Sequence, residues 1–309
     1  MSDEASPVPP PFPDRGIQVP DGLVLVSTPI GNLSDLTARA AACLAQADLV
    51  LCEDTRVTAK LFSAWQISSR LMALHDHNER QKIPTLLDLL RQGKRIALVC
   101  DAGTPLLSDP GFQLVRAAIA AGLPVTAAPG PTAMMMALTL SGLPPHPFLF
   151  LAFPPARHSA RRATFGQLRA AEQAGLSATM IWHEAPHRLV DMLEDLKAVF
   201  GGDREAAVAR ELTKRFEDVQ RGTVAALAEH YRAVPARGEI TVMIAPGVQS
   251  AVAPEEVDHH LSEALRTLSV KDAASLVAGL VDLPRKVVYA RALALSAVPE
   301  RTADDEITS

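Results

Sequence analysis

Short apolar runs alternate with longer segments of mixed polarity over the first 142 residues of the chain. The runs with the length of buried strands are 23–27, 48–52, 70–74, 95–100 and 125–128. The segments 36–47, 83–90 and 112–119 between them are predicted to be helices. Strands that alternate with helices are typical of βα units around a mostly parallel sheet. The pattern therefore predicts an N-terminal α/β domain over residues 21–142.

A cluster of glycine and proline at 140–147 interrupts this pattern and predicts a domain boundary. Further strands are predicted after it, in the apolar runs 148–153, 178–182, 206–209 and 240–245 and in the more polar segment 216–222. Thr223 is predicted to cap the helix that follows segment 216–222. Together they predict a second α/β domain over residues 148–248.

The last part of the chain differs from the two α/β regions. Three short helices are predicted there, at 255–268, 271–279 and 285–295. Ser269 is predicted to cap the second helix, with Asp272 three residues further on. These helices form a small helical subdomain over residues 255–298. Its two candidate roles are contact with RNA, on a faint likeness to a helix-turn-helix, and packing that supports a dimer.

Composition places the chain among ordinary globular proteins, since 48% of its 309 residues are hydrophobic and 21% are charged. Residues 1–20 are rich in proline and lack the order of a signal peptide, so we expect a disordered tail. The three cysteines show no Cys-x-x-Cys spacing, which disfavours a zinc ribbon or a disulfide framework and suits the cytoplasm. No apolar run has membrane-spanning length. A net charge of −5 excludes a polycation, so a nucleic-acid partner needs a local basic patch.

Three turns rich in glycine and proline follow predicted strands of the first domain, at 28–32, 101–105 and 128–132. Ligands of open α/β sheets bind outside the carboxyl ends of the strands, and glycine lets backbone approach a ligand closely. The turns therefore predict a backbone-lined pocket for a small polar ligand. The alternative is three ordinary turns, with Ser108 or Asp109 capping the next helix. The first turn lacks G-x-G-x-x-G and the chain has no phosphate-loop signature, which disfavours a dinucleotide site and a P-loop.

Two polar segments also follow strands of this domain. Cys52-Glu-Asp-Thr-Arg56 predicts either an ion pair or a substrate site, because buried charges are costly unless paired; alternatively, Thr55 simply caps a helix. His75-Asp-His-Asn-Glu79 has three interpretations: a helix cap at Asn78, a substrate contact, and a metal site on a strand face that His75 and His77 share. The metal interpretation lacks a third ligand, so we expect no metal.

Basic and polar residues gather in the second domain. Arg157-His-Ser-Ala-Arg-Arg162, with Arg169 beyond it, contains no acidic residue. Such a run is either a solvated helix face or a phosphate-binding patch, whose affinity would depend on salt. His183-Glu-Ala-Pro-His-Arg188 follows a strand and offers Glu184 and Arg188 as exposed polar candidates.

Motifs in both domains occur in one unbroken order from about Leu23 to Leu295. Those in the first domain are Thr28-Pro-Ile-Gly-Asn-Leu-Ser-Asp-Leu-Thr37, Cys52-Glu-Asp-Thr-Arg56, His75-Asp-His-Asn-Glu79, Asp101-Ala-Gly-Thr-Pro105 and Pro129-Gly-Pro131. Those in the second domain are Pro186-His-Arg-Leu189, Ala209-Arg-Glu-Leu-Thr-Lys214 and Gly238-Glu239. Together they closely resemble the ribosomal RNA small subunit methyltransferase I family.

The resemblance implies an α/β, two-domain tetrapyrrole-methylase-like fold with S-adenosylmethionine (SAM) held between the domains. It also implies a homodimer and 2'-O-methylation of a cytidine in the decoding region of bacterial 16S rRNA, free or within the small ribosomal subunit. The residues it implies for the SAM pocket are Pro29, Ile30, Asp101, Ala102, Gly103, Thr132, Ala133, His183, Leu212 and Glu239. The chain reads His183-Glu-Ala185 where the family often has Tyr-Glu-Ser, so a tyrosine hydroxyl is missing there.

Methyl transfer to a ribose hydroxyl needs in-line alignment and a group that takes the proton. The candidates for these catalytic roles, among which the sequence selects no base, are Glu53, Asp54, Arg56, Asp76, His77, Glu184 and Arg188. The candidates for RNA contact are Arg157, Arg161, Arg162 and Arg169. The alternatives are a tetrapyrrole (precorrin or porphyrin) C-methyltransferase of the same fold, a non-catalytic RNA-binding module, and a metal hydrolase using residues 75–77.

Overall fold

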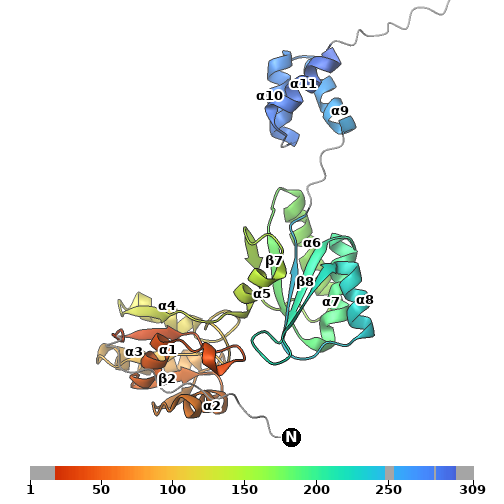
Figure 1. The fold of residues 1–309 in the computed structure, drawn as a ribbon. Helices are drawn as coiled ribbons and strands as arrows, with labels where there is room; N and C mark the ends of the chain where they lie inside the picture. The colour runs from red at the N-terminus through yellow and green to blue at the C-terminus, as the bar shows by residue number, and fades with distance from the viewer. Residues whose placement is uncertain (1–17, 248–253, 282, 297–309) are drawn as a thin grey trace, which may run out of the picture. The chain divides into compact units, whose positions relative to one another are not determined.

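The computed structural model describes residues 18–247, 254–281 and 283–296 (Figure 1). The chain divides into two compact units, Met1–Gly247 and Val248–Ser309. Of the predicted tail at 1–20, only residues 18–20 lie within the described residues.

The first sheet is parallel throughout, as the alternation of strands and helices predicted. Its strands are β1 (Leu23–Val26), β2 (Leu49–Cys52), β3 (Leu71–Ala73), β4 (Ile96–Leu98) and β5 (Val125–Ala128). They lie in the order β3-β2-β4-β1-β5, and every pairing between neighbours is parallel. The carboxyl ends of all five strands therefore meet at one edge, which is where the three glycine- and proline-rich turns begin.

Helices cover both faces of the first sheet. They are η1 (Leu33–Asp35), α1 (Ala38–Ala45), α2 (Thr55–Trp65), α3 (Glu79–Arg91) and α4 (Phe112–Ala120). Residues of α1 and α2 pack with Val24 and Val50 on one face. Residues of α3 and α4 pack with Leu49 and Leu51 on the other face. Alternate positions of β2 thus point into two separate apolar layers, which explains why the whole strand is apolar.

The second sheet is mixed. Its strands are β6 (Phe148–Phe150), β7 (Thr179–Glu184), β8 (Glu205–Arg210), β9 (Asp218–Thr223) and β10 (Ile240–Ile244), in the order β6-β7-β10-β8-β9. Only β6 and β7 pair in parallel. The helices that follow the chain here are α6 (His158–Gln173), η2 (Pro186–Arg188), α7 (Leu189–Phe200) and α8 (Val224–Ala233). Thr223 caps α8 as predicted, since its side chain accepts a hydrogen bond from the Ala226 amide.

A helix without a sequence prediction connects the two sheets. α5 (Ala133–Ser141) follows the last strand of the first sheet but packs against β7, β8 and β10 of the second sheet. Its buried residues Ala137 and Leu138 share an apolar cluster with Ile30, from the turn after β1. The two sheets are therefore joined by packing as well as by the chain. The domain limits at 142 and 148 stay a prediction.

The second unit holds α9 (Pro254–Leu265), α10 (Val270–Val281) and α11 (Arg285–Ser296), which pack around an apolar core of their own. The predicted cap at Ser269 is confirmed: its hydroxyl accepts from the Asp272 amide at 3.2 Å and donates to the Asp272 carboxylate at 2.7 Å. Among the helices within the described ranges, none is long and apolar enough to cross a membrane.

Candidate active site

A cavity of about 360 Å³ lies in the first unit, lined by residues from both sheets. The first-sheet side consists of residues from the turns after β1, β4 and β5. The second-sheet side consists of residues from the strand ends and adjoining loops of β6, β7, β8 and β10. A concave site of this size with apolar walls and a few polar groups suits a small-molecule ligand.

Hydrogen bonds tie the three predicted turns of the first sheet together. Thr28 and Gly103 exchange backbone hydrogen bonds of 2.8 and 3.1 Å. The Thr104 hydroxyl lies 2.9 Å from the Ser27 hydroxyl and donates to the Pro131 carbonyl at 3.2 Å. The pocket predicted from these turns is therefore present as one connected rim of backbone and hydroxyl groups.

Most residues that the resemblance implied for the cofactor lie in the cavity wall. Those in the wall are Ile30, Ala102, Gly103, Thr132, Ala133, His183, Leu212 and Glu239. Pro29 and Asp101 are not among the lining residues. Asp101 instead accepts a hydrogen bond from the Asp54 amide at 3.2 Å, so its carboxylate fastens the turn after β4 to the start of α2.

Aromatic rings form part of the second-sheet wall. The His183 ring lies 5.0 Å from the Phe150 ring and 5.6 Å from the Phe153 ring, measured between centroids. Its Nδ1 is 3.1 Å from the Thr241 hydroxyl. Burial lowers the pKa of His183, and the Glu239 carboxylate opposes this only in part. The imidazole is therefore neutral at pH 7, an apolar and hydrogen-bonding surface rather than a charge.

The buried Glu184 forms an ion pair with the half-buried Arg188, which corrects the expectation that both are exposed candidates. Arg188 donates from Nη2 to the Glu184 carboxylate at 3.1 Å, and the Ala185 amide donates to the same carboxylate at 2.8 Å. Burial raises the pKa of Glu184, while the Ala185 hydrogen bond and the Arg188 charge lower it. Glu184 lines the cavity but is held by these donors, and Arg188 lies outside the lining.

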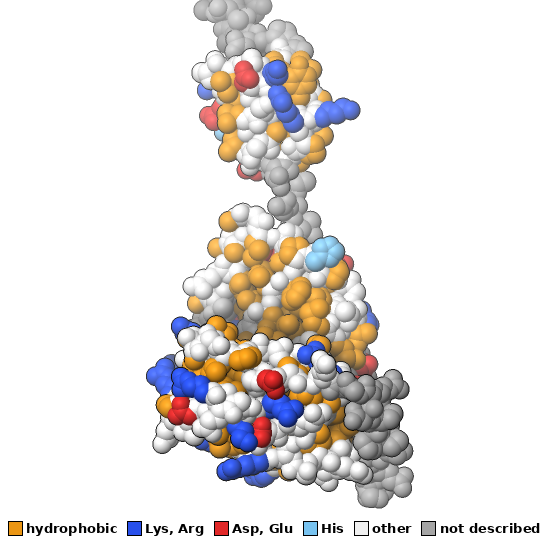
Figure 2. Space-filling model, turned by 90° about the vertical axis from the view of Figure 1, so that its left-hand side faces the viewer, with side chains coloured by type: hydrophobic (Ala, Val, Ile, Leu, Met, Phe, Trp, Pro, Cys, Tyr) orange, Lys and Arg blue, Asp and Glu red, His pale blue; other side chains and the backbone are white. Residues whose placement is uncertain are grey.

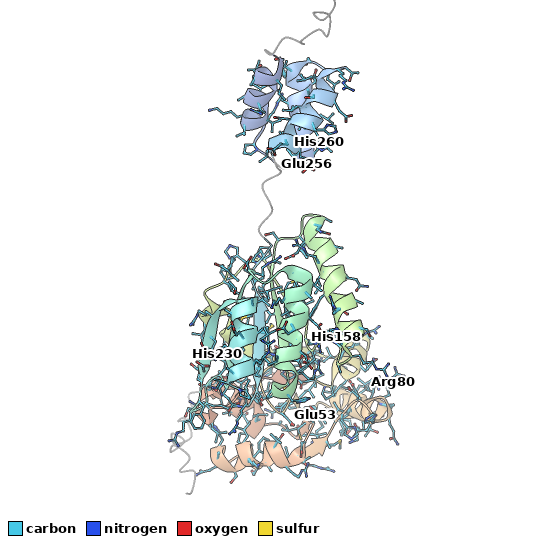
Figure 3. All side chains as sticks on the ribbon, turned by 90° about the vertical axis from the view of Figure 1, so that its right-hand side faces the viewer. Glu53, Arg80, His158, His230, Glu256 and His260 are labelled. Carbon is cyan, nitrogen blue, oxygen red and sulfur yellow. The ribbon has the colours of Figure 1, made fainter. Side chains whose placement is uncertain are left out.

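The segment Cys52–Arg56 folds as an ion pair at a helix start. Asp54 caps α2, in the place predicted for Thr55, and accepts from Arg56 at 2.6 Å. The hydrogen bonds from Arg56 lower the pKa of Asp54 to about 2. Glu53 is exposed (labelled in Figure 3), and its pKa is raised by desolvation and by the Asp101 and Asp76 charges. None of these residues lines the cavity, which favours the ion-pair interpretation.

The segment 75–79 forms a turn rather than the end of a strand. Because β3 ends at Ala73, His75 and His77 do not share a strand face. The Asn78 side chain accepts from the His75 amide at 3.0 Å and forms no cap bond to α3. Asp76 is exposed and outside the cavity lining, as is His77. Over the described ranges, no group of three His, Cys, Asp or Glu side chains is placed to hold a metal ion.

The arginines predicted as one basic patch have different surroundings. Arg161 is buried: its side chain is 3% exposed and pairs with Asp195, 1% exposed, at 2.7 Å. It therefore offers no free charge to a phosphate, which corrects its assignment to an exposed patch. Arg169 pairs with Glu172 at 3.1 Å. Arg157 and Arg162 are exposed.

The cavity wall also contains residues that the sequence did not single out as ligand contacts. They are Leu107, Ser108, Asp109, Met134, Phe150, Phe153, Ala185, Pro186, Ala209, Gly238, Ile240 and Thr241, whereas Thr104 belongs to the predicted turn 101–105. Asp109 was considered only as a helix cap, but Gly111 occupies that place. Leu106 and Ser108 have φ of 75° and 80°, so the turn that carries Asp109 is strained. Desolvation raises the pKa of Asp109 to about 6; a hydrogen bond with Cys100 lowers it in part, and the Glu53 and Asp101 charges add to the rise.

Comparison with known proteins identifies the family. Residues 22–228 match the family model Tetrapyrrole (Corrin/Porphyrin) Methylases, and residues 251–296 match the RsmI C-terminal HTH domain. The chain is 43% identical to the ribosomal RNA small subunit methyltransferase I of Mesorhizobium japonicum, over 88% of this chain and 92% of that protein. The chain belongs to the ribosomal RNA small subunit methyltransferase I family.

Solved structures support the fold of this family member. The methyltransferase CobJ matches with a TM-score of 0.54 and 20% identity, over 75% of this chain and 95% of that chain. A uroporphyrin-III C-methyltransferase from Thermus thermophilus, complexed with S-adenosylhomocysteine, matches with a TM-score of 0.50 and 18% identity, over 72% of this chain and 97% of that chain. The chain thus has the two-domain α/β fold of the tetrapyrrole methylases with an additional helical unit, as the resemblance implied.

Proposed function

We propose that the protein is a SAM-dependent methyltransferase that methylates the 2'-oxygen of a cytidine in the decoding region of bacterial 16S rRNA. The observation that carries the proposal is the cavity, whose wall bears the family's motifs at the turns after β1, β4 and β5. A relative matched over 92% of its own length is named as a small-subunit rRNA methyltransferase. The strand-end position of the cavity is also the expected ligand site of an α/β sheet.

The cavity wall suits the chemistry of SAM, which combines an apolar purine, a polar amino-acid end and a positive sulfonium. Apolar side chains such as Ile30, Met134 and Leu212 offer surface for a flat ring. Gly103, with φ of 85°, leaves its backbone open to close approach. Among the described residues that line the cavity there are three carboxyl groups and no Lys or Arg, which favours a cationic ligand.

Bound there, SAM supplies the methyl group for an in-line displacement. The chain's own part is to hold the ribose in line and to accept the proton of the 2'-hydroxyl. Of the three carboxyls in the wall, Glu184 pairs with Arg188 and Glu239 with Lys214. Asp109 forms no salt bridge with any described residue. We therefore assign Asp109 as the proton acceptor.

The proposed step balances in the following way. The 2'-oxygen forms its bond to the methyl carbon as the carbon–sulfur bond breaks, and that electron pair stays on sulfur. The hydroxyl proton passes to the Asp109 carboxylate. With a pKa of about 6, Asp109 is ionised at pH 7 and still basic enough to take the proton in the transition state.

The partners proposed for this enzyme are 16S rRNA, free or within the small ribosomal subunit, and a second copy of the chain. Figure 2 shows hydrophobic side chains gathered over the second-sheet half of the first unit, with few Lys and Arg among them. Large apolar side chains are also exposed on helices of this unit: Met135 on α5, and Phe112 and Ile119 on α4 beside the first sheet. Exposed apolar surface of this kind is typical of a protein interface and supports a homodimer. Since the substrate is ribosomal, the proposed compartment is the cytoplasm.

The direct test is methyl transfer from labelled SAM to 16S rRNA and to small subunits that lack the modification, with nuclease mapping of the product. Label on the 2'-oxygen of a decoding-region cytidine is the expected result. SAM binding without label on either RNA would overturn the substrate, and precorrin and porphyrin acceptors would be tested next. Absence of SAM binding would overturn the cofactor as well.

A further inference from the structure

The loop between β6 and α6, residues 151–157, is held in place by hydrogen bonds to every second backbone carbonyl, those of residues 152, 154 and 156. The Ala152 carbonyl accepts from the His183 amide at 2.9 Å, and the Pro154 carbonyl accepts from Arg188 at 2.8 Å. The Ala156 carbonyl is within 3.5 Å of Arg161. We refer to residues 151–157 as the braced loop.

Both arginines that hold the braced loop are themselves anchored by buried carboxylates. Arg188 pairs with Glu184, whose side chain is fully buried, and Arg161 pairs with the buried Asp195. Charges are buried in this way at a large desolvation cost, which only good geometry offsets. The two ion pairs together determine the path of the braced loop, so their four residues have a positioning role.

The bracing turns the intervening side chains outward. Ala152 has φ of 53°, an unfavourable conformation for a residue with a Cβ, immediately before Phe153. Phe153 is 55% exposed, although it lines the cavity and its ring lies beside that of His183. Arg157 at the other end of the loop is exposed and forms no salt bridge with any described residue. A half-exposed phenyl ring on a fixed loop is a preorganised contact surface.

We propose that Phe153 and Arg157 form a nucleotide-binding edge at the mouth of the cavity, where the Phe153 ring stacks on a base of the rRNA substrate and Arg157 contacts a phosphate. The inference rests on the proposed function, because a 2'-oxygen in reach of the cavity brings its own base within reach of the rim. Single-stranded RNA is recognised through bases stacked on aromatic rings and phosphates paired with basic side chains.

Charge distinguishes this edge from the cofactor cavity. The cavity wall carries carboxyls, which suit a cation. Residues 153–162 contain no acid; Arg161 and His158 both pair with the buried Asp195, which leaves Arg157 and Arg162 as the exposed cations without a salt bridge to any described residue. Figure 3 shows His158, the first residue of α6, at the end of this helix nearer to the first sheet. The two free cations make this segment suited to a polyanion, unlike the cavity wall.

The test compares Phe153→Ala, Phe153→Trp and Arg157→Ala with Phe216→Ala in the full chain. Phe216 is a matched control, since it is 65% exposed, has an arginine 5.5 Å from its ring centroid and does not line the cavity. Two affinities are measured for each variant: that for SAM by calorimetry, and that for unmethylated small ribosomal subunits and 16S rRNA across a range of salt concentrations.

Loss of one stacked base is expected to weaken RNA binding by Phe153→Ala about 5- to 150-fold. Because Phe153 also lines the cavity, the test is relative: its loss of RNA affinity should clearly exceed any loss of SAM affinity. Phe153→Trp should restore RNA binding, and Phe216→Ala should match the wild type. Arg157→Ala should weaken RNA binding and make the salt dependence shallower by about one ion.

Two results would overturn the inference. Unchanged RNA affinity in Phe153→Ala would show that the ring stacks on no base. An equal loss of SAM affinity would assign the ring to the cofactor instead. Failure of the proposed function is distinguishable, because it is measured in the wild type. A wild type that binds SAM but methylates no rRNA would contradict the proposed function, and the nucleotide-binding edge with it.

Discussion

Thr28 and Gly103 exchange two backbone hydrogen bonds that join the turn after β1 to the turn after β4. Because these turns belong to strands that are far apart in sequence but adjacent in the sheet, the bonds hold both turns at one rim of the cavity. The conformation of Gly103 is left-handed, with φ of 85°, and a Cβ there would touch Ile30 at 3.4 Å. The proposed cofactor site is thus expected to be sensitive to any side chain at position 103.

Gly103→Val is expected to abolish measurable SAM binding, because the branched side chain strains the backbone and fills space beside Ile30. Gly93→Val is the matched control: Gly93 also has a positive φ, of 78°, but a Cβ there meets nothing within 4 Å. Calorimetry should show wild-type SAM affinity in the control. Equal affinities in both variants would contradict the assignment of the turn to the cofactor.

Asp109→Asn is expected to remove methyl transfer while leaving SAM bound, because the amide cannot accept the hydroxyl proton. In the wild type, kcat/KM should fall as the pH drops through about 6, where Asp109 becomes protonated. The pH profile of kcat/KM in the wild type is measured at RNA concentrations well below KM, and the residual activity of the variant is measured at saturating RNA. A variant that keeps most of its activity would exclude Asp109 as the proton acceptor.

The same substitution should raise stability above pH 6. A carboxyl whose pKa is raised on folding, here to about 6, favours the folded state when it is protonated; that contribution is lost as the pH rises through 6. The amide of the Asp109→Asn variant has no charge to desolvate, so its Tm should exceed that of the wild type at about pH 8. The difference should shrink toward about pH 4, where both side chains are neutral. A Tm gain that is constant across this range would contradict the pKa assignment.

Arg161→Ala is expected to destabilise the first unit by about 3–5 kcal/mol, because it leaves the Asp195 carboxylate buried without its main partner. Arg162→Ala, one residue further along α6 and exposed, should change stability by about 0.5 kcal/mol or less. Urea denaturation of both variants distinguishes the two arginines. Equal losses of stability in the two variants would contradict a buried, structural role for Arg161.

Ser269→Ala should destabilise the helical unit by about 1 kcal/mol, since it removes the side chain that caps α10. Ser275→Ala on the exposed side of the same helix is the control and should be neutral or slightly stabilising. Hydrogen exchange should show faster opening confined to residues 254–296. Faster exchange across the first sheet as well would contradict a unit with its own core.

The pattern of apolar and polar positions was sufficient for the parallel first sheet, because its strands are buried on both faces and separated by helices of recognisable period. Local capping was predictable at Thr223 and Ser269, where the partner amide lies three residues away. The three turns of the cofactor rim were also predictable, since each glycine- and proline-rich segment follows its own strand. These features depend on neighbours in the sequence.

Tertiary structure alone decided which charged residues are surface and which are structural. Arg161 and Arg162 are adjacent in the chain, yet only Arg161 faces α7 and Asp195, which lies 34 residues further along. Asp109 could likewise be placed only by the structure. The N-cap of α4 is Gly111 and not Asp109, and the strained turn before it places Asp109 in the cavity wall. The sequence by itself therefore determined the strands, the caps and the turns. Packing decided which distant charges pair and which residues line the cavity, because burial depends on residues far away along the chain.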